Sequence, residues 1–187
     1  MITSKRDLCE YIAADEDYLR PVGVKAKIIE RITQYPTRET RRYLLYLRKQ
    51  EYYINTANGS KIKGMLGLFY EGKKNRLGTR LGIEIGPNCF EKGLTVYHIG
   101  SIIVNSSARI GENCRLHGSN CIGNKGTDNG SPKIGNNVDI GYGAVIIGDI
   151  EIADNVVIGA NAVVNKSVTV PGSVIVGVPG SIVKRGG

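Results

Sequence analysis

The chain has 187 residues with a formal net charge of +8, and 41% of its residues are hydrophobic. This length can bury a sizeable core in one domain, or in one domain with an appendage. No apolar run approaches the roughly 18 residues of a membrane-spanning helix. The N-terminal segment is interrupted by charges, unlike a signal peptide, and the four cysteines form no CxxC pair. We therefore expect a soluble, cytoplasmic protein without a disulfide framework.

The positive charge is concentrated in the first part of the chain. Residues 1–80 contain 17 Lys and Arg against 9 Asp and Glu, whereas residues 81–187 contain 8 of each. Two interpretations stay open: a solvated helical face, or attraction for an anionic partner such as a phosphorylated or acidic-sugar substrate or a membrane surface. Nucleic acid is not expected, because no binding motif accompanies the charge.

Residues 1–80 predict an α-helical N-terminal cap. Ser4 and Asp7 resemble a capping box, Pro21 suits the first turn of a second helix, and Thr37 suits the N-cap of a third. We expect the apolar stripes of these helices to be buried against each other, the first β coil or another subunit. The stripes are Leu8, Tyr11 and Ile12; Val24, Ile28, Ile29 and Ile32; Tyr43, Leu44, Leu47 and Ile54; and, in a weaker fourth helix, Met65, Leu66, Phe69 and Leu77.

From Leu81 onward a different pattern begins, in which an aliphatic residue returns every sixth position. A first ladder is interrupted at Asp128, within a loop-like segment at residues 124–131, and resumes in the same phase. A second row of small or apolar residues lies two positions before each aliphatic residue, and Cys114 belongs to this row. The aliphatic ladder consists of Val104, Ile110, Leu116, Ile122, Ile134, Ile140, Ile146, Ile152, Ile158, Val164, Val170 and Val176.

A strict period of six fits neither an α-helix nor a single strand. It fits short strands joined by corners, three to a triangular coil, stacked into a parallel β-helix whose aliphatic rows point inward. Small residues such as Gly135, Gly141 and Gly159 follow the ladder positions, where we expect glycine to turn the corner with a positive φ. The predicted fold is therefore mainly β: a β-helix of hexapeptide repeats over residues 81–187, ending in a short tail.

The repeat is irregular at one place that contains a histidine. Inward Val96 is followed by Val104 eight positions later rather than six, and the extra positions lie within Tyr97–Gly100, which includes His98. Departures from a strict local rule are expected at functional sites. We interpret His98 as a general base, the alternative being a corner imidazole satisfied by the backbone.

Two further side chains belong near His98. His117 lies close to one full coil further along the chain and is interpreted as structural or lining the substrate, the alternative being a direct part in the chemistry. Glu84 belongs to the adjoining coil on the N-terminal side and is a candidate to orient the imidazole, the alternative being an exposed strand carboxylate. No metal is expected, because prisms of this kind that act as zinc carbonic anhydrases use three histidines and this chain has two.

These motifs resemble those of the hexapeptide-repeat acyltransferases, which have a left-handed β-helix, and specifically the serine acetyltransferases. Ile83–Pro87 stands where that family has a V-D-I-H-P-like segment whose Asp pairs with the catalytic base. Tyr97–Gly100 stands where the family has D-H followed by small residues, whose His is that base. The resemblance covers about Leu81 to Val183 and implies an acetyl-CoA-dependent O-acetyltransferase with Glu84 and His98 as catalytic residues.

Departures from the family pattern bear on the acceptor. Serine acetyltransferases carry D-R-H-P-K-I at the loop exit, where Arg and His hold the serine carboxylate, whereas this chain reads Asn129–Ile134 as N-G-S-P-K-I. The acid before the catalytic His is replaced by Tyr97. Without a cationic partner a buried serine carboxylate would be poorly stabilised. We therefore expect a sugar or polysaccharide-precursor hydroxyl as acceptor, with Tyr97 and His117 in substrate binding; L-serine is the alternative.

The resemblance also implies a coenzyme A groove and an oligomer. The C-terminal segments that resemble the coenzyme-binding segments of the family, and the residues near them, give the candidates Tyr142, Gly143, Ala160, Asn165, Lys166, Lys184 and Arg185. The alternatives are that Gly143 and Ala160 serve only the corner geometry, and that Lys184 and Arg185 belong to a solvated tail. The family's G-V-P-A-[KR] reads G-V-P-G-S here, so the basic residue is displaced. The expected assembly is a homotrimer with sites between subunits, with pairing of trimers through the cap left open. A scaffold or ligand-binding prism without activity is the alternative from another class.

Overall fold

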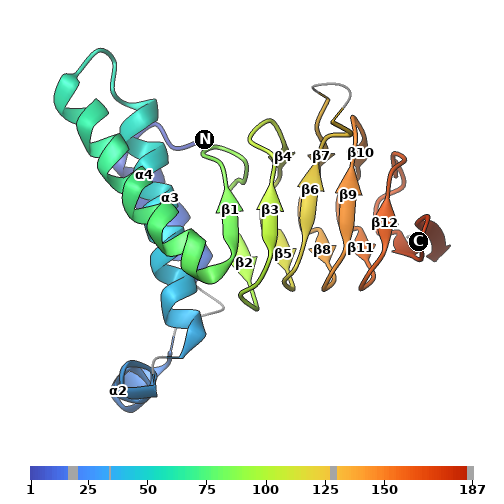
Figure 1. The fold of residues 1–187 in the computed structure, drawn as a ribbon, viewed down its shortest axis with the longest axis horizontal. Helices are drawn as coiled ribbons and strands as arrows, with labels where there is room; N and C mark the ends of the chain where they lie inside the picture. Colours follow the sequence, from blue (N-terminus) through green and yellow to red (C-terminus); the bar gives the residue numbers. More distant parts are fainter. Residues whose placement is uncertain (17–20, 34, 127–129, 185–187) are drawn as a thin grey trace.

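The computed structural model describes residues 1–16, 21–33, 35–126 and 130–184. A helical cap covers one end of a long β-helix whose coils succeed one another away from the cap (Figure 1). The helices are α1 (Lys5–Glu16), α2 (Gly23–Thr33), α3 (Pro36–Asn55) and α4 (Lys61–Leu81). None of the helices in these described ranges is both long and apolar enough to cross a bilayer. The predicted left-handed β-helix with an N-terminal helical cap is confirmed.

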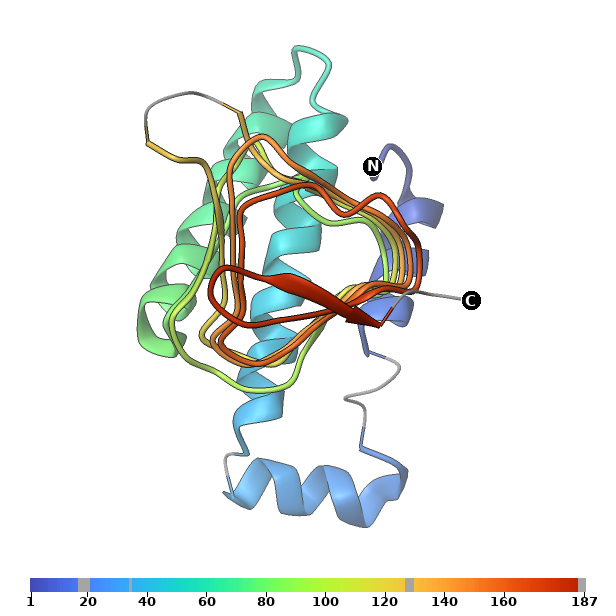
Figure 2. The same ribbon diagram turned by 90° about the vertical axis from the view of Figure 1, so that its right-hand side faces the viewer.

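The β-helix has three faces, and successive turns of the chain add short strands to them, which gives the triangular outline seen along its axis (Figure 2). The first sheet contains β1 (Ile83–Ile85), β3 (Ile102–Val104), β6 (Cys121–Gly123), β9 (Val145–Ile147) and β12 (Val163–Val164). The second contains β4 (Arg109–Ile110), β7 (Lys133–Ile134) and β10 (Glu151–Ile152). The third contains β2 (Thr95–Val96), β5 (Arg115–Leu116), β8 (Asp139–Ile140), β11 (Val157–Ile158), β13 (Val174–Val176) and the antiparallel β14 (Ser181–Lys184).

The strand register shows where the coils depart from their usual length. A regular coil contains three hexapeptide units (hexads), so paired residues in neighbouring coils are normally three hexads apart. Val145 pairs with Val163, as that length requires. Thr95 pairs with Arg115, two positions beyond three hexads, while Ile103 pairs with Cys121 at the regular spacing. The extra positions therefore lie at the corner between β2 and β3, as predicted.

A second departure lies between β6 and β7. Cys121 pairs with Val145, four hexads further along the chain, so this coil contains one additional hexad. It coincides with the predicted loop at residues 124–131, of which residues 127–129 fall outside the described residues. The aliphatic ladder keeps its phase across this coil because the addition is a whole hexad.

The aliphatic ladder fills the interior of the β-helix, except at its C-terminal end. Leu116, Ile122, Ile140 and Ile146 have no exposed surface, and Cys114 is equally buried. Val170 and Val176, predicted to point inward, are 37% and 38% exposed, whereas Val168 and Ile175 are buried. The prediction was wrong there because Ile152 pairs with Val168, two positions short of three hexads, and Val157 of β11 pairs with Val174 of β13, one position short. The shorter coil shifts the phase of the repeat.

The corner chemistry also differs from the prediction. The left-handed conformation occurs three positions after the inward aliphatic, at Asn113, Ser119, Asn137, Gly143, Asn155 and Asn161, where asparagine tolerates it well. Gly141, which directly follows the aliphatic, does not have a positive φ. A Cβ there would lie 2.6 Å from the backbone nitrogen of Ala160 in the next coil. Glycine is needed at this position because two coils approach closely, rather than because of backbone conformation.

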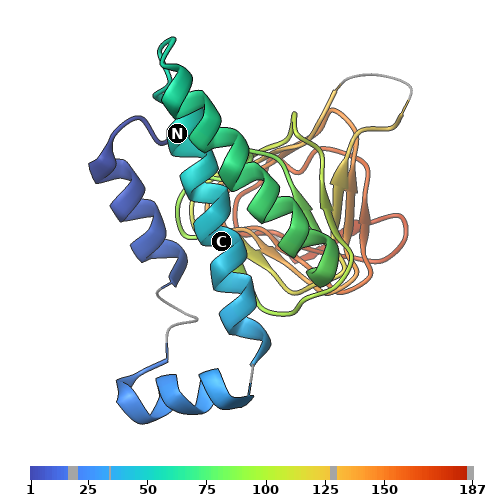
Figure 3. The ribbon, with the colours of Figure 1, turned by 60° about the vertical axis from the view of Figure 1, so that its left-hand side comes forward.

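Within the cap, α3 and α4 pack side by side across the first coil, and α1 lies along α3 (Figure 3). Tyr43, Leu44 and Leu47 are buried as predicted. The Ser4–Asp7 capping box is confirmed by reciprocal hydrogen bonds of 3.1 and 2.9 Å. The proposed Thr37 cap is wrong: α3 begins at Pro36 after Tyr35, which makes no side-chain cap. Proline fits the first turn because its missing N–H would have no helical partner there.

Two predicted apolar stripes are not buried within the chain. Val24, Ile28, Ile29 and Ile32 of α2 are 52–76% exposed, and α2 lies away from the rest of the cap. On α4, Met65 and Phe69 are exposed although Leu77 is buried, so these residues do not share one packed face. Amphipathic spacing identified the helices correctly, but it does not specify which surface each helix covers.

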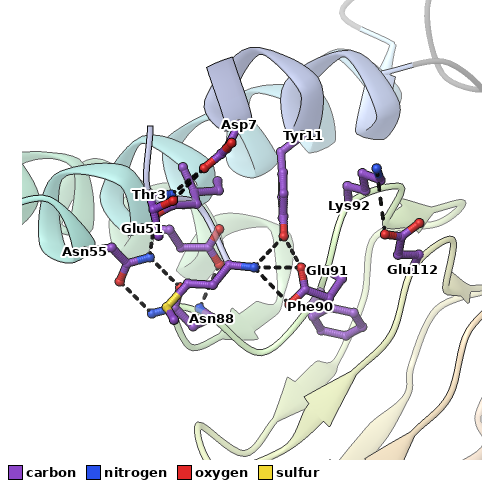
Figure 4. A network of polar contacts seen from close by, with 12 residues as sticks. Thr3, Asp7, Tyr11, Glu51, Asn55, Asn88, Phe90, Glu91, Lys92 and Glu112 are labelled. Atoms are coloured by element: carbon purple, nitrogen blue, oxygen red, sulfur yellow. Dashed lines mark hydrogen bonds and ion pairs between the residues drawn. The ribbon is translucent and has the colours of Figure 1, made fainter. Parts of the chain in front are cut away.

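Polar groups join the cap to the first coil. The buried Arg48 on α3 contacts Asp15 of α1 at 2.7 Å and Glu51 at 2.9 Å, and it donates to the carbonyl of Phe90 at 2.8 Å. Around it, Glu51 accepts from the amide of Asn88, Asn55 and Asn88 exchange amide hydrogen bonds, and Tyr11 donates to Glu91 (Figure 4). This network fixes the orientation of the cap relative to the strands that follow.

Candidate active site

The candidate site lies where successive coils turn from the third sheet into the first. We call this column the histidine corner; it consists of residues 97–100, 117–120, 141–143 and 159–161. Neighbouring coils touch there, since a Cβ on Gly118 would lie 3.2 Å from the Cβ of His98 and 3.3 Å from a ring carbon of Tyr142. The structure therefore brings His98, His117, Tyr142, Gly143 and Ala160 to one edge of the β-helix.

The His98 segment is attached to the end of α4. The amide of Gly100 donates to the carbonyl of Leu81 at 3.0 Å, and the amide of Ile102 donates to that of Gly82 at 2.8 Å. Gly82 ends α4 in the left-handed conformation, with φ 69°, and a Cβ there would meet the carbonyl oxygen of Gly100 at 2.9 Å. Residues 97–100, which contain the two extra positions, thus depart from the regular ladder. The imidazole of His98 is exposed and has no hydrogen-bond partner among the described residues.

Glu84 lies at the centre of β1 on the outer face of the first sheet, beside Ile103 of the next coil. Its side chain is exposed. No hydrogen bond joins it to His98 within the described part of the chain, so the Glu84–His98 pairing remains a prediction.

His117 has the carboxylate contact that His98 lacks. Its Nε2 lies 2.7 Å from Oδ1 of Asp139, and Oδ2 of the same carboxylate lies 3.0 Å from Nε of Arg115. The ring of Tyr97 packs on the imidazole with centroids 4.7 Å apart. All four side chains project from the outer face of the third sheet, because Tyr97 and His117 follow strands whose pairing aligns Thr95, Arg115 and Asp139.

Asp139 and Arg115 were not among the site residues predicted from the sequence. Both immediately precede inward residues, Ile140 and Leu116, so the alternation of a strand places them outward. Arg115 and Asp139 pair although they are four hexads apart in the sequence. The only signal in the sequence was the extra hexad at residues 124–131, which lengthens this coil from three hexads to four.

The predicted coenzyme residues divide between different parts of the β-helix. Tyr142 accepts a hydrogen bond of 3.0 Å from Ser119 and is 52% exposed at the histidine corner. Asn165 and Lys166 are exposed after β12, at the next corner, where the first sheet turns toward the second. Lys184 lies on β14 at the end of the third sheet, and Arg185 is outside the described residues. The coenzyme-binding role of these residues remains a prediction, as does the expected groove between neighbouring subunits.

Metal ligands and reactive thiols are not evident at the site. In residues 1–16, 21–33, 35–126 and 130–184, no three His, Cys, Asp or Glu side chains gather as potential ligands. Burial raises the pKa of the Cys89 and Cys114 thiols, so both stay protonated near neutral pH. The groups available for acid–base chemistry are therefore the two imidazoles and the carboxylates near them.

Comparison with known proteins agrees with this architecture. Residues 131–166 match the family described as "Bacterial transferase hexapeptide (six repeats)". Residues 131–166 thus resemble the hexapeptide repeats of that family, over less than half of the chain. A segment of 57 residues, 30% of the chain, is 36% identical to the "Putative colanic acid biosynthesis acetyltransferase WcaB" of Escherichia coli K12. The matched segment spans 35% of the length of that relative.

The whole fold is similar to that of solved serine acetyltransferases. The soybean apoenzyme superposes with a TM-score of 0.73 at 24% identity, covering 96% of this chain and 70% of the soybean chain. The Neisseria gonorrhoeae enzyme gives 0.67 at 25% identity, covering 97% and 66%. A serine acetyltransferase in complex with CoA gives 0.72 at 22% identity, covering 96% and 71%. The cap and the β-helix together thus share the serine acetyltransferase arrangement.

Proposed function

We propose that the protein is an acetyl-CoA-dependent O-acetyltransferase that acetylates a hydroxyl of a sugar or polysaccharide precursor in the cytoplasm. The observation that carries the proposal is the exposed His98, held on an insertion at a corner of a hexapeptide β-helix. The names of the similar proteins, an acetyltransferase of colanic acid biosynthesis and serine acetyltransferases, support the reaction class.

In the proposed reaction, His98 accepts the proton of the acceptor hydroxyl as its oxygen attacks the thioester carbonyl. The new C–O bond forms, the C–S bond breaks, and the imidazolium returns its proton to the departing thiolate. A positioned general base of this type contributes about 10²–10⁴-fold to the rate. Glu84 is the proposed carboxylate partner, which would stabilise the imidazolium by the attraction of an opposite charge.

The loop exit favours an acceptor without a carboxylate. Ser131 is 8% exposed, and its hydroxyl donates to Asn105 at 3.2 Å. Lys133, the nearest following cation, lies 3.5 Å from Glu151 across the second sheet. Ser131 offers only a neutral hydroxyl, and the ammonium of Lys133 already has a carboxylate partner and lacks the planar fork with which an arginine holds a carboxylate. A sugar hydroxyl makes no such demand.

Coenzyme A binding and assembly belong to the same proposal. Tyr142, Gly143 and Ala160 would line the pantetheine arm at the histidine corner, and Asn165, Lys166, Lys184 and Arg185 would meet the more distant, anionic part. Because these residues divide between two corners, a homotrimer that brings the corners of neighbouring chains together would complete the groove. Exposed apolar side chains on the flat faces, such as Ile103 (49%) and Val157 (41%), are suited to such contacts. Light scattering that gives a monomer at assay concentration would remove the shared site.

The test is an acceptor screen, with CoA thiol release measured for methyl glycosides, UDP-sugars and L-serine. We expect turnover with a sugar, and a kcat lower by about 10²–10⁴-fold in His98→Asn. The acetyl-CoA-induced rise in melting temperature should persist in that variant. Glu84→Gln should lower kcat less than His98→Asn, because it leaves the base in place.

Two other outcomes would change the assignment. The similarity to a Neisseria gonorrhoeae serine acetyltransferase solved with serine favours L-serine as the second candidate, and turnover with L-serine alone would replace the sugar. Wild-type turnover by His98→Asn would reject His98 as the base. Absence of any acetyl-CoA-induced thermal shift, together with no thiol release, would favour a non-catalytic prism.

A further inference from the structure

The cluster on the third sheet next to the histidine corner is a built arrangement of polar groups. It consists of Tyr97, Arg115, His117 and Asp139, which we call the sheet-three cluster. Asp139 is the central member, because its two carboxylate oxygens contact His117 at 2.7 Å and Arg115 at 3.0 Å. Its side chain is 24% exposed, against 38% for His117 and 46% for Arg115.

The contacts determine which nitrogen of His117 carries the proton. A carboxylate can only accept, so the short contact with Asp139 requires a proton on Nε2 of the neutral ring. Nδ1 is then the hydrogen-bond acceptor. Arg115 contributes through its Nε and holds the other oxygen of Asp139, which limits rotation of the carboxylate. Asp139 thereby fixes both the tautomer and the orientation of His117, as second partners of functional histidines commonly do.

The cluster also has the shape and charge of a sugar-binding surface. Tyr97 packs against the imidazole, so an aromatic ring lies beside the Nδ1 atom of His117 and a carboxylate. The charges of Arg115 and Asp139 compensate one another. An uncharged sugar with several hydroxyls matches these groups. The carboxylate of an amino acid would have to compete with Asp139 for the guanidinium of Arg115.

The position relative to His98 gives the cluster a role in the reaction. His117 precedes Gly118, and a Cβ on Gly118 would lie 3.2 Å from the Cβ of His98. The two imidazoles therefore project from adjacent coils. We infer that the sheet-three cluster is the acceptor subsite, that it takes a sugar with neighbouring hydroxyls, and that Asp139 is a positioning residue that acts through His117. This inference rests on the proposed function, and it names the residues that select the sugar.

The experiment combines kinetics with two measurements that need no turnover. Asp139→Ala and Arg115→Gln are compared with Glu151→Gln, which breaks a similar cross-strand ion pair, Lys133–Glu151, on the second sheet, away from any histidine. In the full chain as purified, ¹⁵N NMR reads the imidazole tautomer of His117. Saturation-transfer NMR reads the binding of methyl glycosides to wild type and variants.

We expect Asp139→Ala to raise the KM for the acceptor by about 10- to 100-fold, because this is the effect of losing one hydrogen bond to a charged group. The KM for acetyl-CoA should stay unchanged. The Nε2–H tautomer should dominate in wild type and give way to a mixture in Asp139→Ala, with loss of saturation transfer. Asp139→Asn, whose amide oxygen can still accept from Nε2, should recover part of each effect, and Glu151→Gln should behave as wild type.

The outcomes separate this inference from the proposed function. One outcome is thiol release with a sugar, together with an unchanged acceptor KM and unchanged saturation transfer in Asp139→Ala. It would overturn the assignment of the acceptor subsite and leave the proposed acetyltransferase function standing. No thiol release with any acceptor, combined with sugar binding that Asp139→Ala abolishes, rejects the reaction and supports the subsite. A neutral wild-type His117 that carries its proton on Nδ1 overturns the positioning role directly. Turnover with L-serine alone overturns the sugar as the ligand of this subsite.

Discussion

The cap and the β-helix are stabilised in different ways. Within the described residues from 83 to 184, the buried side chains include no Asp, Glu, Lys or Arg. The cap has four such residues where it meets the first coil: Arg48, Asp15, Glu51 and Lys74 are 0–5% exposed. The repeat is therefore held by apolar contacts spread along its length, whereas the cap adds a few concentrated contacts of buried charged groups to its apolar core.

This difference determines how each region responds to a change. A coil of the β-helix contacts only its two neighbours, so a defect in one coil has a limited reach. In the cap, Arg48 alone connects α1, α3 and the carbonyl groups of Phe90 and Glu91. Burial opposes its charge, but Glu51 and Asp15 raise the pKa of Arg48 above its ordinary value, so it stays a cation. Losing it leaves several buried groups without a partner.

Arg48→Ala should therefore give the largest loss of stability. We expect the free energy of unfolding to fall by about 3–5 kcal/mol, because Asp15 and Glu51 become uncompensated buried charges. Urea unfolding followed by circular dichroism measures it. Arg6→Ala is the control, since the Arg6–Glu10 pair on α1 is exposed and should contribute less than about 0.5 kcal/mol. A loss below about 1 kcal/mol for Arg48→Ala would mean that apolar contacts hold the cap.

Gly141→Ala tests the close packing of coils in the β-helix. The added Cβ would lie 2.6 Å from the nitrogen of Ala160 and 2.8 Å from the carbonyl carbon of Gly159, both in the backbone of the next coil. Because backbone cannot move aside cheaply, we expect a cost of about 1–3 kcal/mol in thermal or urea unfolding. Gly123→Ala is the matched strand variant: no atom lies within 4 Å of its Cβ, and it should change stability little. Equal costs for the two variants would contradict the close approach.

The interior of the β-helix was predictable because inward positions recur in a fixed phase. The prediction held from Val104 to Val164 and was wrong at Val170 and Val176, where a shortened coil changes the phase. The role of Gly141 could not be predicted, since the atoms that exclude a side chain there belong to the next coil. Local sequence specifies periodicity, but contacts between coils depend on register.

The contacts of the cap and of the site were harder to predict from the sequence, because they too join residues that are far apart in the chain. Nothing near Arg48 in the sequence identifies the distant Asp15 as its partner. His98 was found as a break in a rule, which is a local signal. Asp139 breaks no rule, because an outward charged residue is ordinary on a strand, and only its alignment with Arg115 and His117 reveals it.

The smallest effect concerns a capping contact at the start of α1 and depends on pH. Hydrogen bonds from the Thr3 amide, the Thr3 hydroxyl and Ser4 lower the pKa of Asp7 to about 2, from an ordinary value of 3.8. A carboxyl whose pKa is depressed by folding stabilises the fold above its unfolded pKa, and this stabilisation is lost as pH falls from about 4 toward 2.

Wild type should therefore exceed Asp7→Asn in melting temperature at pH 5 to 7, and the difference should shrink as the pH falls from 4 to 2. Because Asp7 is at the surface, the difference should be small beside that of Arg48→Ala. The comparison is made by circular dichroism melts at matched ionic strength. A difference that does not vary between pH 2 and pH 6 would mean that the carboxylate charge is unimportant for the cap, and that only the exchange of hydrogen bonds with Ser4 and Thr3 matters.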